Sequence, residues 1–344
     1  QSPIPNTQSP IPNPQSPKFI FQILLLTLYF ILYTNYYQKK MNKWMSRIND
    51  QKSLALINIP GSHDSAAFNM FCCGSCFAKT QNYDIKTQLN IGARMLDLRV
   101  ATMSNSSFDN NMIDSMICCH GVCDCYCYEN NKKIKLTYAN CLNQIKNFLN
   151  ENPSETIIIR TDSGRGNKKI NLENASKVFN SILGDISVQY NNKLILGDIR
   201  GKVVYVYSNR FEGGTDIFPI HDRYRNGNMK FNEFKVGGVL KIREINDLFQ
   251  SYHYTFDEAE KYLKLPLNFE TSCTGEFTGL LPLPKAEADV VNRFLREYNF
   301  KKGFYYGWIA VDFIDEIITR KIIESNIFQE SNEVQDTSNI FLQV

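Results

Sequence analysis

The stretch "LALINIPGSHDSAAF" (54–68) joins a short apolar run to a Gly- and Ser-rich bend that carries a histidine beside an aspartate. The run is short and apolar, and a turn signal follows it at once, which predicts a β-strand over 54–59. His63 and Asp64 then lie just past the end of that strand. A histidine in such a place can be structural, a metal ligand or a proton carrier, and the remaining sequence has to decide among these roles.

Other apolar runs along the chain alternate between strand-like and helix-like patterns. Strands are predicted over 93–100, 116–120, 155–160, 201–209 and 307–313, and helices over 138–153, 175–183, 286–300 and 314–326. Alternation of this kind is typical of parallel βα units. We therefore predict an α/β fold, namely a (β/α) TIM-type barrel that is irregular or incompletely closed. The 344 residues, 43% of them hydrophobic, suffice for one such barrel or for two smaller domains.

Polar residues fall at or near the ends of these predicted strands. Asp97 and Arg99 are two residues apart and so share one face of their strand. His120, Arg160 and Asp312 each stand near the end of another strand. In a parallel barrel the carboxyl ends of the strands meet on one rim, where such enzymes keep their chemistry. Charged groups inside strands need partners, and that rim supplies them.

Five segments in order resemble the catalytic X domain of the phosphatidylinositol-specific phospholipase C family, and its compact bacterial branch more than the multidomain one. They are "NKWMSRINDQKSLALINIPGSHDSAAF" (42–68), "TQNYDIKTQLNIGARMLDLRV" (80–100), "CCHG" (118–121), "FLNENPSETIIIR" (148–160) and "GWIAVDFID" (307–315). Each segment alone is weak evidence, but five in register are strong.

The resemblance implies a phosphoric diester lyase. It would cleave phosphatidylinositol, or a glycosyl-phosphatidylinositol lipid, to diacylglycerol and inositol 1,2-cyclic phosphate. His63 would take the proton of the inositol 2-hydroxyl, and His120 would protonate the departing oxygen. Asp312 would orient His63, and Asp64 would orient His120. Histidine titrates near neutrality, so one ring can start neutral and the other charged.

The resemblance also implies groups that bind the substrate. Arg99 would balance the charge of the phosphate, with Asp97 supporting it. Arg210, Asp222 and Tyr224 would contact the inositol. The family has a basic residue at the end of the strand that carries Arg160, but strict register places Asp162 there. Arg160 or Arg165 could substitute, or the role could be lost; an ordinary surface arginine is the equal alternative for Arg160.

Two other functions compete with this interpretation. One is a metal-dependent glycerophosphodiester-type phosphodiesterase, and the other is a non-catalytic lipid-binding module. Arg99 opposes the first, because a fixed cation at the phosphate would repel a divalent metal. The presence of all the implied catalytic residues opposes the second. We therefore expect no metal and no cofactor. A net charge of +3 gives no nucleic-acid footprint, so the expected partner is phosphatidylinositol in a membrane surface, and a monomer is expected.

The first 40 residues differ from the rest. Residues 1–17 form a Pro-rich low-complexity segment, and 18–40 form a hydrophobic segment, either an anchor or uncleaved signal or an artefact of the gene model with Met41 as the true start. The catalytic barrel is expected over 41–326 and a polar tail over 327–344. The protein is expected to be membrane-associated or secreted, or cytoplasmic if 1–40 are absent and the cysteines are reduced.

Eight of the ten cysteines form two clusters, one at 72–76 and the other at 118–127. Disulfides between the clusters would fit an exported protein. A zinc staple is a weaker alternative, because the spacing in "CDCYC" is not that of zinc sites. Reduced, buried or lipidated thiols are the third. We favour disulfides.

Overall fold

The computed structural model describes residues 17–70, 78–103, 115–207, 268–271 and 284–329. Contacts divide the chain into two units, 1–40 and 41–344. Helix α1 (Pro17–Asn42), which belongs to the first unit as far as residue 40, leaves large apolar side chains such as Leu24, Leu26 and Phe30 exposed. Of the helices that the structure describes, none combines the length and the apolar character needed to cross a membrane.

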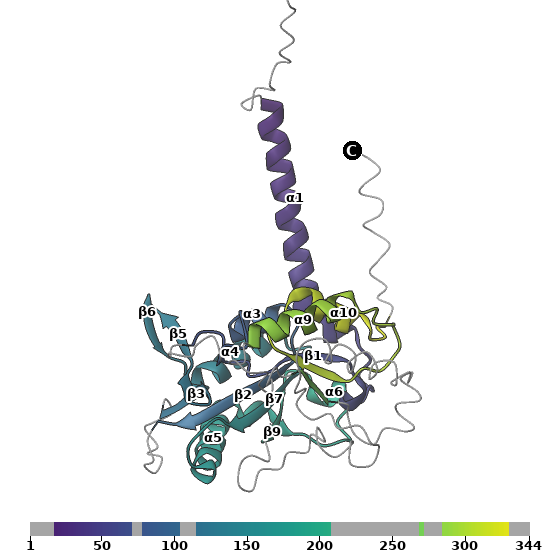
Figure 1. Ribbon diagram of the computed structural model, residues 1–344. Coiled ribbons are helices and arrows are strands. Elements are labelled where there is room, and N and C mark those ends of the chain that lie inside the picture. Colours follow the sequence, from purple (N-terminus) through teal and green to yellow (C-terminus); the bar gives the residue numbers. More distant parts are fainter. Residues whose placement is uncertain (1–16, 71–77, 104–114, 208–267, 272–283, 330–344) are drawn as a thin grey trace, which may run out of the picture. The chain divides into compact units, whose positions relative to one another are not determined.

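The second unit is built on a parallel sheet (Figure 1). Its strands are β1 (Ile59–Ser62), β2 (Met95–Thr102), β7 (Ile157–Ser163), β8 (Ser187–Gln189), β9 (Val203–Tyr207), β10 (Asn268–Thr271) and β11 (Trp308–Val311). They pair in parallel in the order β10-β11-β1-β2-β7-β9-β8. Within the described ranges the two edge strands do not pair, so the ring stays open. This agrees with the irregular or incompletely closed barrel that the sequence predicts.

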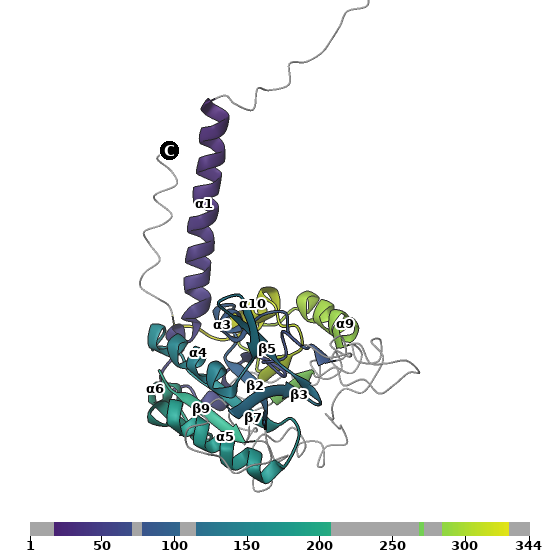
Figure 2. The ribbon, with the colours of Figure 1, turned by 90° about the vertical axis from the view of Figure 1, so that its left-hand side faces the viewer.

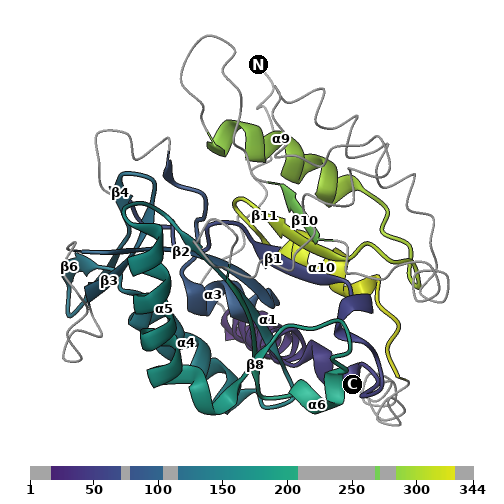
Figure 3. The ribbon, with the colours of Figure 1, turned by 90° about the horizontal axis from the view of Figure 1, so that it is seen from below.

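Helices pack along this sheet. They are α3 (Ile85–Asn90), α4 (Tyr138–Glu151), α5 (Lys168–Leu183), α6 (Leu196–Ile199), α9 (Pro284–Glu297) and α10 (Glu316–Glu324). Figure 2 shows α5 and α6 beside β9, and Figure 3 shows α9 and α10 beside β10, β11 and β1. Helix α4 begins with a capping box, in which Thr137 and Asn140 satisfy each other's backbone N–H groups. Its apolar face, with Leu142 and Ile145, lies in the main core.

The prediction that 116–120 forms a further parallel strand is wrong. Strand β3 (Met116–His120) runs antiparallel to β2, with Val100 opposite Cys118, and continues through β4 (Cys123–Asp124). A parallel pair needs a long crossover, usually a helix, and the polar sequence of 103–115 has no helical apolar spacing. An apolar run does not encode its own direction, so periodicity alone could not reveal this. A separate two-stranded sheet, β5 (Tyr126–Glu129) with β6 (Lys132–Lys135), follows.

The first predicted strand is also displaced along the chain. Leu54–Leu56 is a 3-10 helix, and the strand begins at Ile59. The Pro60–Gly61 pair reads as a bend in the sequence, yet both residues lie inside β1. A Cβ at Gly61 would lie 2.8 Å from the Cβ of Met95, so the close approach of β1 to β2 requires glycine.

A buried ion pair closes the amino-terminal end of the strands. The Nε of Arg94 donates to Glu155 Oε2 at 3.0 Å, and its Nη atoms donate to backbone carbonyls that include those of Met41 and Asn42. Trp44 and Met45, just after these carbonyls, are fully buried. Residues 41–45 are thus tied to the sheet at the end opposite the polar rim.

Candidate active site

His63 and Asp312 follow neighbouring parallel strands. His63 comes directly after β1, and Asp312 comes directly after β11. Because the carboxyl ends of parallel neighbours lie side by side, His63 Nδ1 meets Asp312 Oδ1 at 2.8 Å. Both side chains are buried. The carboxylate therefore fixes the orientation of the imidazole in a site shielded from water.

Arg99, on β2, approaches the other nitrogen of the same ring. Its Nη2 is hydrogen-bonded to His63 Nε2. A guanidinium can only donate, so Nε2 accepts in this bond. The proton of the neutral ring then lies on Nδ1 and is donated to Asp312. His63 thus presents an unprotonated Nε2, the form required of a proton acceptor.

Asp97 links two arginines beneath the ring. Its Oδ1 accepts a hydrogen bond from Arg160 Nη1 at 2.9 Å, and its Oδ2 lies 3.5 Å from Arg99 Nε and 3.8 Å from His63 Nε2. Burial would raise the pKa of Asp97, but Arg160, Arg99 and His63 outweigh it and hold the pKa below its usual range. Asp97 therefore stays ionised and holds Arg99 at the site.

Asp64 carries a carboxylate in an adverse environment. The residue has a left-handed φ of +41° and is fully buried, and neither carboxylate oxygen accepts a hydrogen bond from any residue that the structure describes. Burial raises its pKa, against the opposing effect of Arg99 and His120. The distance between Arg99 Nε and Asp64 Oδ2 is 3.7 Å. A left-handed backbone conformation and a buried carboxylate both cost folding free energy. Such costs at one residue are typical of a residue that serves the function of the protein.

His120 reaches this site because β3 runs antiparallel to β2. The register turns β3 back alongside the strand that carries Arg99. Asp64 Oδ2 lies 3.4 Å from His120 Nδ1, but that nitrogen donates its hydrogen bond to the carbonyl oxygen of Ala78, at 2.7 Å. The His120 side chain is 21% exposed, whereas that of His63 is 2% exposed. The partly open ring is thus the one at the mouth of the site.

Sequence reasoning did not identify several residues that hold the His63 turn. Gln81 is fully buried, and its Nε2 donates to the carbonyls of His63 (2.8 Å) and Val311 (2.9 Å). It thereby joins the ends of β1 and β11. Ser65 ties the turn to β2, since its N–H donates to the Asp97 carbonyl at 2.7 Å. A buried glutamine in a loop has no periodic signal, so only its proximity to "GSHD" could have pointed to it.

Of the residues predicted to bind the substrate, Arg160 and Arg165 lie in the part of the chain that the structure describes. Arg160 is buried on β7, and its Nη1 also lies 3.5 Å from Asp162. Arg165 binds the β3–β4 turn through the Val122 carbonyl (2.7 Å) and Asp124. Residues 210, 222 and 224, the predicted inositol contacts, lie outside the described residues.

The cysteines near His120 are mostly free. Cys118, Cys119, Cys125, Cys127 and Cys141 are free thiols, whereas Cys123 is disulfide-bonded. The predicted bridge to the cluster at 72–76 involves cysteines outside the described residues. Burial raises the pKa of Cys119 to about 12, so its thiol is inert at neutral pH. In the part of the chain that the structure describes, no three His, Cys, Asp or Glu side chains are placed to hold a metal ion.

Comparisons with known proteins concern the whole chain and its fold. No family model matches the chain. A 1-phosphatidylinositol phosphodiesterase of Staphylococcus aureus (strain Newman) is 27% identical over 328 residues, which cover 84% of this chain and 95% of the relative. The corresponding protein of Listeria monocytogenes is 24% identical over 303 residues, covering 83% and 85%.

Two solved structures extend the comparison to the fold. A mutant of the S. aureus phosphatidylinositol-specific phospholipase C has a TM-score of 0.62 at 21% identity, covering 84% of this chain and 99% of that one. The L. monocytogenes enzyme has a TM-score of 0.59 at 21% identity, with the same coverage. The resemblance predicted from the five sequence segments is thus confirmed: the chain is a homologue of the bacterial phosphatidylinositol-specific phospholipases C and has their irregular (β/α) barrel fold.

Proposed function

We propose that this protein is a phosphatidylinositol-specific phospholipase C, which cleaves phosphatidylinositol to diacylglycerol and inositol 1,2-cyclic phosphate. One observation carries the proposal. Asp312, His63, Arg99, Asp64 and His120 form an unbroken series of contacts at the carboxyl ends of the strands. The names of the relatives support the same reaction class.

In the first half of the reaction His63 is the general base. Its Nε2 takes the proton of the inositol 2-hydroxyl, while Nδ1 keeps its bond to Asp312. The resulting imidazolium is stabilised by that carboxylate, as in other carboxylate–histidine pairs. The 2-oxygen then attacks the neighbouring phosphorus and forms the cyclic diester. The nucleophile belongs to the substrate, so attack is intramolecular and needs no bound water.

In the second half His120 is the general acid. Protonated on both nitrogens, it donates from Nε2 to the departing diacylglycerol oxygen, while Nδ1 remains bound to the Ala78 carbonyl. The carboxylate of Asp64 lies 3.4 Å from the same Nδ1. The P–O bond to diacylglycerol breaks as the new O–H bond forms, so no free alkoxide is released.

Arg99 is the phosphate-binding group in this proposal. A guanidinium matches two oxygens of a phosphate, and its attraction grows as negative charge develops in the transition state. Asp97 and Arg160 position it: Asp97 lies 3.5 Å from Arg99 Nε, and Arg160 binds Asp97 from the other side. We assign Arg160 to this positioning role, and we propose that Arg210, Asp222 and Tyr224 contact the inositol ring.

We also propose that the enzyme works at a membrane surface, as a monomer and without a metal or other cofactor. A structure of the S. aureus enzyme concerned with modulation of its membrane binding, 19% identical with a TM-score of 0.60, supports the membrane part.

A direct assay tests the function. The purified full chain is incubated with phosphatidylinositol vesicles in the presence of a chelator, and the water-soluble product is identified by phosphorus NMR. We expect inositol 1,2-cyclic phosphate, formed at the same rate with or without chelator, and no product from Arg99→Asp. Product that is inositol phosphate alone, or activity that disappears with the chelator, would contradict the proposed mechanism.

A further inference from the structure

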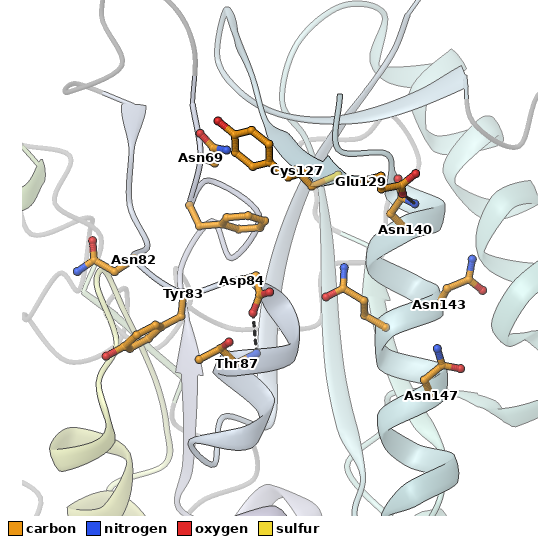
Figure 4. A pocket seen from close by; sticks show the side chains of 13 residues that line it. Asn69, Asn82, Tyr83, Asp84, Thr87, Cys127, Glu129, Asn140, Asn143 and Asn147 are labelled. Carbon is orange, nitrogen blue, oxygen red and sulfur yellow. Dashed lines mark hydrogen bonds between the residues drawn. The ribbon is translucent and has the colours of Figure 1, made fainter. Parts of the chain in front are cut away.

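A second cleft lies on another part of the barrel, between α3, α4 and the β5–β6 hairpin (Figure 4). Its volume is about 790 Å³. None of the groups of the candidate active site lines it. The proposed function therefore leaves this cleft without a role.

One wall of the cleft is a row of amide side chains on α4. Asn140, Asn143, Gln144 and Asn147 are spaced at i, i+3, i+4 and i+7, which places them on one face. Figure 4 shows Asn140, Asn143 and Asn147 along that helix. Asparagine is a poorer helix former than alanine or glutamine, so three of them on one face weaken the helix.

Only part of this row is used by the fold. Asn140 belongs to the capping box at the start of α4, and the Gln144 side-chain oxygen accepts from Lys86 N at 3.3 Å. Asn143 and Asn147 are exposed, and neither side chain makes a hydrogen bond to any residue that the structure describes. These two amides are therefore available to a ligand, each with two donors and one acceptor.

The charge of the lining excludes anionic ligands. Asp84 and Glu129 line the cleft, and no Lys, Arg or His is among the described lining residues. Asp84 Oδ1 already accepts from Thr87 N at 2.8 Å and caps α3. Carboxylates and amides without a cation repel a phosphate but accept hydrogen bonds from hydroxyl groups.

Two exposed aromatic rings complete the cleft. Tyr83 is 39% exposed and Tyr128 is 66% exposed, and they come from the loop before α3 and from β5 respectively. Apart from Phe68 and Cys127, every lining residue carries an amide, a hydroxyl or a carboxylate. The lining thus offers few apolar sockets for the side chains of a peptide. It suits a ring-shaped polyol, whose hydroxyls meet the amides while its C–H face packs on tyrosine.

We propose that this cleft is a binding site for a neutral carbohydrate, separate from the site of phosphodiester cleavage. Asn143 and Asn147 hydrogen-bond vicinal hydroxyls, and Tyr83 or Tyr128 covers the apolar face of the sugar ring. None of the active-site groups lines this cleft, so a sugar bound there leaves the chemistry at His63 and His120 unchanged.

Saturation-transfer NMR on the full chain tests the proposal. The probes are maltotetraose, mannotetraose and chitotetraose at millimolar concentration, with tetra-alanine as a peptide probe. Two proteins are compared with the unmodified chain: the double variant Asn143→Ala/Asn147→Ala, and Asn150→Ala as the matched control. Asn150 is exposed on the same helix but does not line the cleft.

We expect saturation transfer from the unmodified chain to at least one oligosaccharide. The dissociation constant should be about tenfold higher or more in the double variant, because two hydrogen bonds are lost. It should be unchanged in Asn150→Ala. Phosphatidylinositol cleavage should be equal in all three proteins, and this readout separates the cleft from the active site. The proposal is overturned by no transfer to any oligosaccharide, by equal affinity of the double variant, or by binding of tetra-alanine alone.

Discussion

The two histidines differ in the partner that each Nδ1 holds. His63 donates to a carboxylate, Asp312, at 2.8 Å, whereas His120 donates to the carbonyl of Ala78 at 2.7 Å. A buried carboxylate stabilises a ring that becomes charged during reaction, as a base does. The Ala78 carbonyl fixes the orientation of the His120 ring, and the nearest carboxylate, that of Asp64, lies 3.4 Å from the same nitrogen. This difference supports opposite roles for two residues that look alike in the sequence.

The leaving group should reveal these roles. With phosphatidylinositol, His63→Ala and His120→Ala should each lower kcat by about 10²–10⁴-fold. With a nitrophenyl ester of inositol phosphate, whose leaving group needs little protonation, His120→Ala should recover most of its rate. His63→Ala should not, because the 2-hydroxyl must always lose its proton. Steady-state kinetics on both substrates provides the measurement, and equal losses on both would mean that the roles are wrongly assigned.

Asp64→Asn should stabilise the protein while lowering its activity. Burial raises the pKa of Asp64 above its ordinary value of 3.8, so the folded state disfavours the ionised form. The folded protein is therefore most stable, with respect to this group, at acid pH, where Asp64 is protonated. This part of the free energy of unfolding is lost as the pH rises through the raised pKa. Asparagine stays neutral, and we expect its Tm at pH 7 to be higher by about 2–4 °C, or roughly 1 kcal/mol.

The pH dependence distinguishes this cause from better packing. The Tm advantage of Asp64→Asn should shrink as the pH falls through the raised pKa of Asp64 and should vanish below the ordinary value of 3.8, where the side chain is protonated in both the folded and the unfolded state. Asp185→Asn is the matched control, because its side chain is 67% exposed and carries no burial cost. A Tm of Asp64→Asn equal to or below that of the parent at pH 7 would contradict the argument.

At the scale of elements, the antiparallel β3 is what brings His120 to the rim. Gly164, which follows β7, allows β3 to lie there: a Cβ on it would be 2.5 Å from Cys119 Sγ and 3.1 Å from the Cys119 carbonyl oxygen. Cys119 directly precedes His120. A side chain at residue 164 would therefore push Cys119 away and, with it, move the adjacent His120, the proposed general acid.

Gly164→Ala should lower kcat on phosphatidylinositol by about tenfold to a hundredfold, because a small misplacement of a catalytic group is costly. The nitrophenyl substrate should be affected much less. Cys119→Ala alone should be active, and adding it to Gly164→Ala should restore part of the rate by removing the Sγ atom. Kinetics of the four proteins on both substrates decides the matter. A double variant no faster than Gly164→Ala would show that the contact is not the cause.

The elements show which part of the fold a sequence can predict. The alternation of strands and helices identified β2, β7, β9, β11, α4 and α10, because the strands are short apolar runs that are almost wholly buried and the helices bury residues at helical spacing. Direction and pairing have no periodic signal, so β3 was assigned to the wrong orientation. The predicted strand ends before Pro60 and Gly61, because these residues favour a bend. In the structure both lie inside β1, since pairing with β2 and β11 overrides that local preference. The two-residue spacing of Asp97 and Arg99 correctly placed both on one face. The hydrogen bonds of the Ala78 carbonyl and of Gln81 join segments that are distant in the sequence, so no local pattern could predict them.

At the scale of the whole molecule, the two ends of the barrel have different tasks. The carboxyl end carries the polar rim, and the opposite end is closed by the buried Arg94–Glu155 pair and by Trp44. Burial lowers the pKa of Arg94, although Glu155 opposes this effect. A buried pair of this kind adds little net stability, but removing one partner leaves a charge without compensation.

Glu155→Gln should therefore lower the free energy of unfolding by about 3–5 kcal/mol. Its activity below the unfolding temperature should match that of the parent, because the pair lies away from the rim. Asp50→Asn is the control: it weakens the pair between Arg200 and Asp50, whose side chain is 63% exposed, and should cost no more than about 1 kcal/mol. Urea unfolding of the three proteins provides the values. A loss no larger for Glu155→Gln than for Asp50→Asn would refute the role of the closure.

The hydrogen bond from Arg99 to His63 Nε2 has a consequence for selectivity. In the proposed mechanism the empty enzyme keeps its base capped, because the lone pair that must take the proton is occupied by a guanidinium. A phosphodiester draws Arg99 toward its own oxygens and so frees the nitrogen beside the hydroxyl that will attack. An alcohol or a water molecule without a phosphate has no means of uncapping it. One substrate therefore supplies both the proton to be removed and the anion that permits its removal.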